Sequence, residues 1–457
     1  MNRPRIAGIL ATLSTLMLSC NGSSGAPPTA ELPAATLTTR LSPERPRPVF
    51  HVSAAALVGR SLFLDPALSA SGRQSCASCH APDHAYGPSN GLAVQLGGPN
   101  GKAQGTRAAP SLRYTEYTPA YADLLDNADG IAEPGPGGGF TWDGRVDSLG
   151  EQAKIPLLSA VEMANQGPAD VVAKVRAAAY APAFLAAFGA NALDDVDRAF
   201  ENVALALQSF QIEDNSFHPY SSKFDLHDTK QPGGEFTPAE ERGFKVFNDP
   251  EVGNCASCHF PNPGFDGSKS LLTDFSFEAI GVPRNNEISA NREHNYRDMG
   301  VCGPARKDHA FVPGRSNPFC GLFKTPTLRN AATRQAFFHN GVIHSLEQAV
   351  RFYNTRDAMP ELWYPTLGGT PKPKPDPDFP RYGLVTTQYV GGTVQKFDDL
   401  PAAYHANIDS QKPLDGRAKG SALPMTEQQV GDLLCFLETL TDGYEPGKTP
   451  TKPGCAE

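Results

Sequence analysis

Apolar residues recur every three or four positions in several parts of the chain, the spacing that predicts helices with one buried face. Asp194 and Asp195 can cap one such helix, whose inward positions would be Phe200, Val203, Ala204, Leu207 and Phe210. Another follows Thr426, with an apolar face of Val430, Leu433, Leu434, Phe436 and Leu437. Alternation of apolar and polar residues, the strand pattern, is rare. The chain is therefore predicted to be mainly α, with long loops and few short strands.

The sequence predicts where two further helices begin. Thr237-Pro238-Ala239-Glu240 is a capping box with proline at the first helical position. Ser345 opens a helix that continues through Phe352 and Tyr353.

The N-terminus has the features of an export signal. Arg3 and Arg5 precede an apolar stretch over residues 6–18 and then Ser19-Cys20. The stretch is too short to span a membrane as a mature helix, and no other segment approaches ~20 apolar residues. We interpret residues 1–20 as a lipoprotein signal peptide, with Cys20 lipidated; an ordinary cleaved signal is the alternative. Both place the protein in the periplasm, and the first gives it a lipid anchor.

The remaining chain divides by composition. Residues 21–50 are rich in Ser, Thr, Ala and Pro and are predicted to form a flexible tether. Residues 216–235 are polar and contain Pro-Gly-Gly, so we expect a linker there. It would separate an N-terminal domain, residues 51–215, from a C-terminal domain, residues 236–445, with a tail at 446–457. A Pro-rich stretch, residues 361–419, is predicted to be a long irregular loop.

The charge balance bears on partners. The chain has 40 Lys and Arg against 49 Asp and Glu, a net charge of −9. This balance gives no reason to expect nucleic acid and would suit a basic redox partner.

One five-residue word occurs twice. Cys76-Ala77-Ser78-Cys79-His80 and Cys255-Ala256-Ser257-Cys258-His259 both match the attachment signal for c-type haem, in which Cys76, Cys79, Cys255 and Cys258 bind the porphyrin and His80 and His259 the iron. A four-cysteine zinc site is the alternative. The histidine after each pair favours haem. So do the matching flanks, residues 59–66 and 243–250, which indicate an internal duplication.

Four cysteines remain after these and Cys20. Cys302, Cys320, Cys435 and Cys455 can pair in three ways in an oxidising compartment. Cys302 with Cys320 and Cys435 with Cys455 are the local pairings. A buried free thiol at Cys435 is the alternative, because Cys435 lies in an apolar helix stripe.

Further strings stand outside the haem words: Phe140-Thr141-Trp142-Asp143-Gly144-Arg145, Thr325-Pro326-Thr327-Leu328-Arg329-Asn330 and Phe337-Phe338-His339-Asn340-Gly341. In this order they resemble the bacterial dihaem cytochrome c peroxidase family, which includes the MauG enzymes, over roughly residues 55–440. The resemblance implies two cytochrome c-like haem domains with two covalently bound haem c groups. It also implies that the N-terminal haem reacts with hydrogen peroxide.

The resemblance assigns roles around the first haem. The tryptophan between the haems falls on Trp142, the distal glutamine on Gln152, the distal proline on Pro156 and the acid–base glutamate on Glu162. A carboxylate over an open iron can move the proton that O–O cleavage requires, and an amide can hold the peroxide. Without the resemblance, Glu162 would be interpreted as a surface or capping carboxylate and Trp142 as a core aromatic.

At the second haem, the resemblance places the distal ligand on Tyr353, where the peroxidases have methionine and MauG-like members tyrosine. A thioether raises a haem potential, whereas a phenolate favours the ferric and higher states. The alternative is that Tyr353 is a packed aromatic and that Met359 or Met425 is the ligand.

The chain departs from the family in the string Arg107-Ala108-Ala109-Pro110. Counting back from it, Asn100 stands where reductively activated peroxidases have a distal histidine, and His84 is too near the haem word to replace it. We therefore expect an open first haem. Ala108 replaces an asparagine that, in the family, helps bind an interdomain calcium. The sequence therefore does not decide whether this chain binds calcium. Phe140 stands where some members have Gln.

Three functions compete. The first is a peroxidase that reduces hydrogen peroxide with electrons from a small periplasmic cytochrome c or cupredoxin. The second is a MauG-like enzyme that uses a bis-high-valent dihaem to oxidise Trp or Tyr of a partner protein, which Tyr353 and the missing histidine favour. The third is a dihaem electron carrier without chemistry, against which Gln152 and Glu162 argue.

Overall fold

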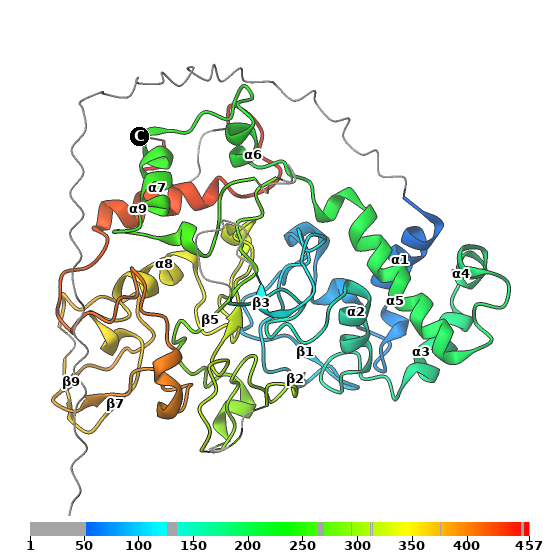
Figure 1. Cartoon of the computed structure of the whole chain (residues 1–457), viewed down its shortest axis with the longest axis horizontal. Helices are drawn as coiled ribbons and strands as arrows, with labels where there is room; N and C mark the ends of the chain where they lie inside the picture. Colours follow the sequence, from blue (N-terminus) through cyan, green and yellow to red (C-terminus); the bar gives the residue numbers. More distant parts are fainter. Residues whose placement is uncertain are drawn as a thin grey trace, which may run out of the picture. The chain divides into compact units, whose positions relative to one another are not determined.

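The computed structural model describes residues 52–456 except 126–134, 264–268, 294, 311, 313, 375 and 449–451. The predicted signal peptide, Cys20 and the tether lie outside these residues. The helices are α1 (Ala54–Leu64), α2 (Leu149–Leu158), α3 (Pro168–Ala177), α4 (Ala181–Phe188), α5 (Val196–Glu213), α6 (Lys223–Asp228), α7 (Pro238–Asn248), α8 (Leu346–Thr355) and α9 (Glu427–Glu438) (Figure 1).

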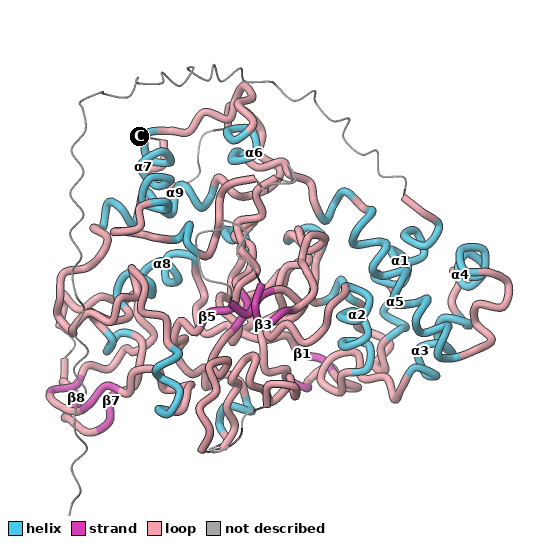
Figure 2. The backbone as a smooth tube through the Cα atoms, in the orientation of Figure 1, coloured by secondary structure: helices cyan, strands magenta, loops and turns pink. Residues whose placement is uncertain are grey.

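Strands are short and pair antiparallel. The pairs are β1 (Leu96–Gly97) with β2 (Ala103–Gln104), β3 (Ala122–Leu125) with β4 (Gly135–Gly137), β5 (Phe277–Glu278) with β6 (Phe323–Lys324), β7 (Thr366–Leu367) with β10 (Thr393–Val394), and β8 (Thr370–Pro371) with β9 (Tyr389–Val390). Loops connect these elements over long stretches (Figure 2). Helix outweighs strand in the described residues, as predicted.

The predicted helix starts are confirmed. Asp195 caps α5 by accepting from the Arg198 N–H. Thr237 and Glu240 form the capping box of α7, and Thr426 and Gln429 form that of α9. Each pair satisfies amide donors that have no partner inside the helix.

A glycine lets two helices cross closely in each half of the duplication. α1 packs against α5, and α7 packs against α9 (Figure 1). A Cβ added at Gly59 of α1 would collide with the backbone carbonyl of Ala206, and one added at Gly243 of α7 with the carbonyl of Asp432. The two glycines occupy the same place in the duplicated flanks, so the repeated sequence specifies a repeated helix crossing.

Replacing Gly243 with Ala is expected to lower the free energy of unfolding by about 1–3 kcal/mol, the usual cost of overpacking. Gly431→Ala in α9 is the matched control, because a Cβ there meets no atom within 4 Å. Alanine should instead stabilise that helix by up to about 1 kcal/mol. Urea denaturation measures both variants, and equal stabilities would contradict the close crossing.

Two apolar clusters divide along the sequence within the segment 216–235, where Phe217 belongs to the first and Phe224 to the second. The first combines α1 to α5, with Leu62 and Phe210 buried; the second combines α6, α7 and α9. The segment 216–235, where a linker was predicted, contains α6. Phe224 joins the second cluster, and Asp225 is buried and bound by both Arg329 amino groups, at 3.0 and 2.9 Å. The domain boundaries stay a prediction, since the described residues form one compact unit.

The disulfides follow the local pairings, Cys302–Cys320 and Cys435–Cys455. Cys435 is therefore not a free thiol. No single helix in the described ranges is long and apolar enough to cross a membrane. Only α3 and α4 taken together reach the required length and apolar character, and this pair is bent by 110°.

Candidate functional site

Each Cys-x-x-Cys-His segment presents its histidine to a cavity in the same way. His80 Nδ1 lies 3.1 Å from the carbonyl oxygen of Tyr86, and His259 Nδ1 lies 3.1 Å from that of Leu272. A carbonyl oxygen only accepts, so Nδ1 carries the proton and Nε2 keeps its lone pair. Burial lowers the pKa of both imidazoles to about 4. Both rings are therefore neutral at pH 7 and can bind a metal.

The cysteines complete two separate sets. One cavity is lined by Cys76, Cys79 and His80, and a second by Cys255, Cys258 and His259. The pairs line different cavities, so they do not form the alternative four-cysteine zinc site. The four thiols are unpaired, and burial raises the pKa of each. Neutral thiols and a neutral imidazole beside each cavity fit a covalently attached haem.

The first cavity collects the predicted distal residues from α2 and the turn after it. Gln152 and Pro156 lie one helical turn apart and share a face of α2. Glu162 follows in the turn, where its N–H donates to the Ser159 carbonyl at 3.0 Å. All three line the cavity of His80, which is the one histidine among the described residues that line it. His84 lines the second cavity instead.

The backbone of Glu162 is held by β1 and by the residue that follows it. The Gly98 N–H donates to the Glu162 carbonyl at 2.7 Å. A Cβ added at Gly97 would collide with the carbonyls of Val161 and Glu162, so this approach requires glycine. Glu162 is an exposed residue by its accessible area, although it lines the cavity. Burial of its carboxyl nevertheless raises its pKa, opposed by the Ser159 hydrogen bond and the charge of Arg145.

Trp142 lines both cavities. Its indole Nε1 donates to the Ala108 carbonyl at 2.8 Å, and its own carbonyl accepts from the Lys324 N–H at 2.9 Å. The next residue, Asp143, is fully buried and ion-paired to Arg107 and Arg145, each at 2.8 Å. These bonds hold the indole at the boundary of the two cavities.

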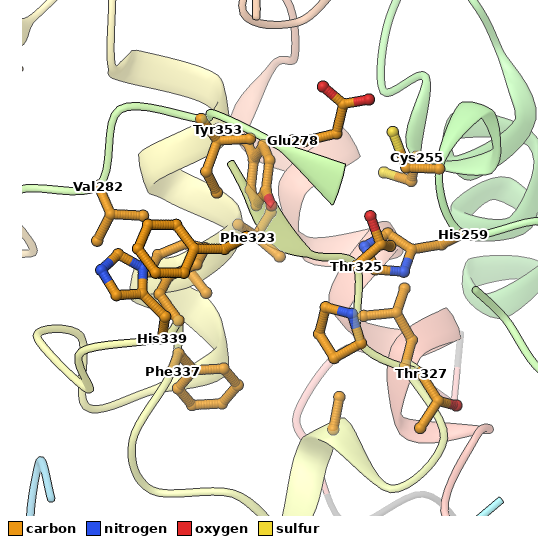
Figure 3. A pocket seen from close by; sticks show the side chains of 18 of the residues that line it. Cys255, His259, Glu278, Val282, Phe323, Thr325, Thr327, Phe337, His339 and Tyr353 are labelled. Carbon is orange, nitrogen blue, oxygen red and sulfur yellow. The ribbon is translucent and has the colours of Figure 1, made fainter. Parts of the chain in front are cut away.

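The second cavity holds Tyr353 of α8. Figure 3 shows Tyr353 and His259 reaching this cavity from different elements. Burial raises the pKa of the Tyr353 phenol, reinforced by the nearby Cys258 and Cys255 thiols. Met425 also lines the cavity, whereas Met359 packs in a different apolar cluster. Of the two methionines that could replace Tyr353 as the ligand, Met425 is therefore the one that lines this cavity.

Lys324 and Glu278 are among the ionisable residues at these cavities that were not predicted. Lys324 lines both cavities and donates through Nζ to the Gly139 carbonyl at 2.6 Å, and burial lowers its pKa to about 7. Glu278 lines the second cavity, where burial, followed by the charges of Asp409 and Asp274, raises its pKa to about 8. The position of Lys324 directly before the Thr-Pro-Thr string was the signal that the sequence offered.

The backbone of Ala108 connects Trp142 to the segment that contains His339. Its N–H donates to the His339 carbonyl at 2.7 Å, and its carbonyl accepts from Trp142. Within the described ranges, no group of three or more His, Cys, Asp or Glu side chains is arranged to hold a metal ion.

The similarity of the chain to known proteins decides the family. Residues 53–231 match the family model described as di-haem cytochrome c peroxidase. Methylamine utilization protein MauG of Paracoccus denitrificans (strain Pd 1222) is 34% identical over 402 residues, 86% of this chain and 90% of that protein. The chain belongs to the dihaem cytochrome c peroxidase and MauG family.

Other members agree in sequence and in fold. Cytochrome c551 peroxidase of Nitrosomonas europaea (strain ATCC 19718) is 28% identical over 65% of this chain and 71% of its own length. The crystal structure of the diheme peroxidase BthA from Burkholderia thailandensis E264 superposes with a TM-score of 0.71 at 34% identity, covering 90% of both chains. The protein is thus a haem peroxidase-like oxidoreductase.

Proposed function

We propose that the protein reduces hydrogen peroxide in the cavity of His80, with electrons shared through the site of His259. A haem held by Cys76, Cys79 and His80 would supply the redox-active iron for this reaction. Glu162 takes the proton from the inner peroxide oxygen and returns it to the leaving one, and the Gln152 amide hydrogen-bonds the peroxide. The observation that carries this proposal is the convergence of Glu162, Gln152 and Pro156 on the His80 cavity.

We propose that the reaction takes place in the periplasm. The export signal and the two haem-attachment words support a periplasmic protein, anchored by a lipid at Cys20. There, a small cytochrome c or cupredoxin would supply the electrons.

One observation favours a second candidate, a MauG-like enzyme that oxidises Trp or Tyr of a partner protein. Tyr353 lines the second cavity. A phenolate opposite His259 would favour oxidised iron over reduced iron. Such a site stores an oxidising equivalent better than it relays electrons at high potential.

Adding peroxide to the resting, fully oxidised protein while recording absorption spectra tests the proposal. We expect a reaction without prior reduction, because His80 is the histidine of the first cavity. Inertness until one haem is reduced would contradict an open first site. Steady turnover with reduced cytochrome c would then support the peroxidase, and a long-lived oxidised state without turnover the MauG-like enzyme.

Trp142→Phe is expected to separate the two sites. The substitution replaces the indole that lines both cavities with a phenyl ring and removes its hydrogen bond to the Ala108 carbonyl. Glu162 and His80 stay in place. The first spectral change with peroxide should therefore keep its rate, and turnover with an electron donor should fall strongly. Stopped-flow and steady-state assays measure the two steps. Unchanged turnover would show that Trp142 is a packing residue.

A further inference from the structure

The second tryptophan of the chain lies beside the helix that carries Tyr353. Trp363 is 2% exposed and lies against Phe352 of α8, with ring centroids 5.4 Å apart. Its indole Nε1 donates to the Thr355 hydroxyl at 2.9 Å. Phe352 directly precedes Tyr353, and their ring centroids are 6.0 Å apart. A buried, readily oxidised indole thus stands one ring away from the residue at the second cavity.

The row of rings continues outward from Trp363. The Tyr382 ring lies 6.2 Å from that of Trp363 and is only partly buried. Arg351 stacks its guanidinium 4.4 Å from the Tyr382 ring centre and is itself held by the exposed carboxylates of Glu347 and Glu427. Tyr382 is therefore fixed in place at the protein surface.

Neighbouring aromatics do not offer the same route. Tyr364 follows Trp363 in the sequence but is fully buried, donates to the Gly281 carbonyl at 2.5 Å and packs against Phe397. Phenylalanine rings can bridge such a route but are too hard to oxidise to hold a charge. In this row the oxidisable stations are therefore Tyr353, Trp363 and Tyr382.

We propose that Trp363 and Tyr382 form a relay that carries electrons from the surface to the second haem site. The relay rests on the proposed peroxide reaction, which supplies the oxidant. For each electron that Trp363 passes inward, Tyr382 gives one to Trp363 and loses its phenolic proton to solvent. A one-electron donor at the surface, either a redox protein or an oxidisable phenol or indole side chain of a partner, restores Tyr382, which regains the proton. Two such passages and two further protons convert one hydrogen peroxide to two waters.

Spin trapping tests the relay on the haem-loaded protein. Peroxide is added without a reductant in the presence of a nitroso spin trap, and the modified tyrosines are located by peptide mass spectrometry. We expect the adduct on Tyr382. Tyr389, which is 37% exposed on β9, is the internal control for radicals that reach the surface by diffusion.

Two substitutions of one residue separate electron transfer from packing. Trp363→Phe leaves Tyr382 in place and should reduce its adduct to the level of Tyr389. Trp363→Tyr keeps an oxidisable ring there and should restore the adduct. Loss in both variants, or equal labelling of Tyr382 and Tyr389 in the unaltered protein, overturns the relay.

The peroxide consumed in the same samples separates the two proposals. Consumption with no preference for Tyr382 overturns the relay and leaves the peroxide reaction standing. Absence of consumption overturns both. Unfolding midpoints in urea, measured on each variant, confirm that the substitutions leave the fold intact.

Discussion

Glu162→Gln is expected to slow the reaction with hydrogen peroxide by about 10²–10⁴-fold, the usual contribution of a positioned acid–base group. The amide keeps the size and hydrogen-bonding reach of the side chain but cannot take up the proton of the inner peroxide oxygen. Stopped-flow absorption at several peroxide concentrations gives the second-order rate constant. A rate within a few-fold of the unaltered protein would remove Glu162 from the mechanism and with it the main support for the proposed peroxide reaction.

The pH dependence gives a second readout of the same residue. Burial raises the pKa of Glu162 above its usual 4.5. The carboxylate is the form that accepts a proton, so the rate should rise as pH increases through the raised pKa and level off above it. The Gln variant should lack this limb. Glu201→Gln, which removes an exposed carboxylate paired with Lys154, is the matched control and should keep both the rate and the limb.

The helices were the most predictable part of the fold, because their signals are local. Asp195, Thr237 and Thr426 announce helix starts within four residues of sequence, and the spacing of apolar residues marks the buried face. The close crossings were not predicted. Gly59 and Gly243 are visible as a repeated letter, but the carbonyls that exclude a side chain belong to helices far along the chain.

The site was predictable only as far as the family strings reach. Gln152, Glu162 and Trp142 lie in or close to such a string, and the structure brings them to one cavity. Lys324 was missed because a lysine in a sequence is by default a surface residue. Lys324 is half-buried, and the ring centres of Phe140 and Phe275, which come from other segments, lie 5.5 and 5.7 Å from its Nζ.

The choice between Tyr353 and Met425 shows the same limit of sequence. The two residues are far apart in the chain, and the structure places both at the second cavity. Asn354, next to Tyr353, donates to the Met425 carbonyl at 3.0 Å and accepts from its N–H at 2.8 Å. The Asn354 side chain therefore holds the backbone of Met425 next to the helix that carries Tyr353. Sequence position alone does not choose between the two candidate ligands.

Tyr353→Met is expected to raise the reduction potential of the second haem, because a neutral thioether stabilises reduced iron and a phenolate stabilises oxidised iron. A spectroelectrochemical titration measures the shift. Met425→Leu is the matched control: it removes the competing thioether and should leave both the potential and the spectrum unchanged. A shift in Met425→Leu with none in Tyr353→Met would make Met425 the ligand.

The proton on Tyr353 sets how that potential depends on pH. Burial raises the pKa of the free phenol, so the phenolate exists at neutral pH only while it binds a cation. Lowering the pH favours the protonated phenol and opposes ligation, so the potential of the unaltered protein should rise as pH falls. A thioether carries no proton, and the Met variant should lose this contribution. The two titrations together therefore test whether the second site stores an oxidising equivalent or passes electrons on, which is the difference between the two proposed enzymes.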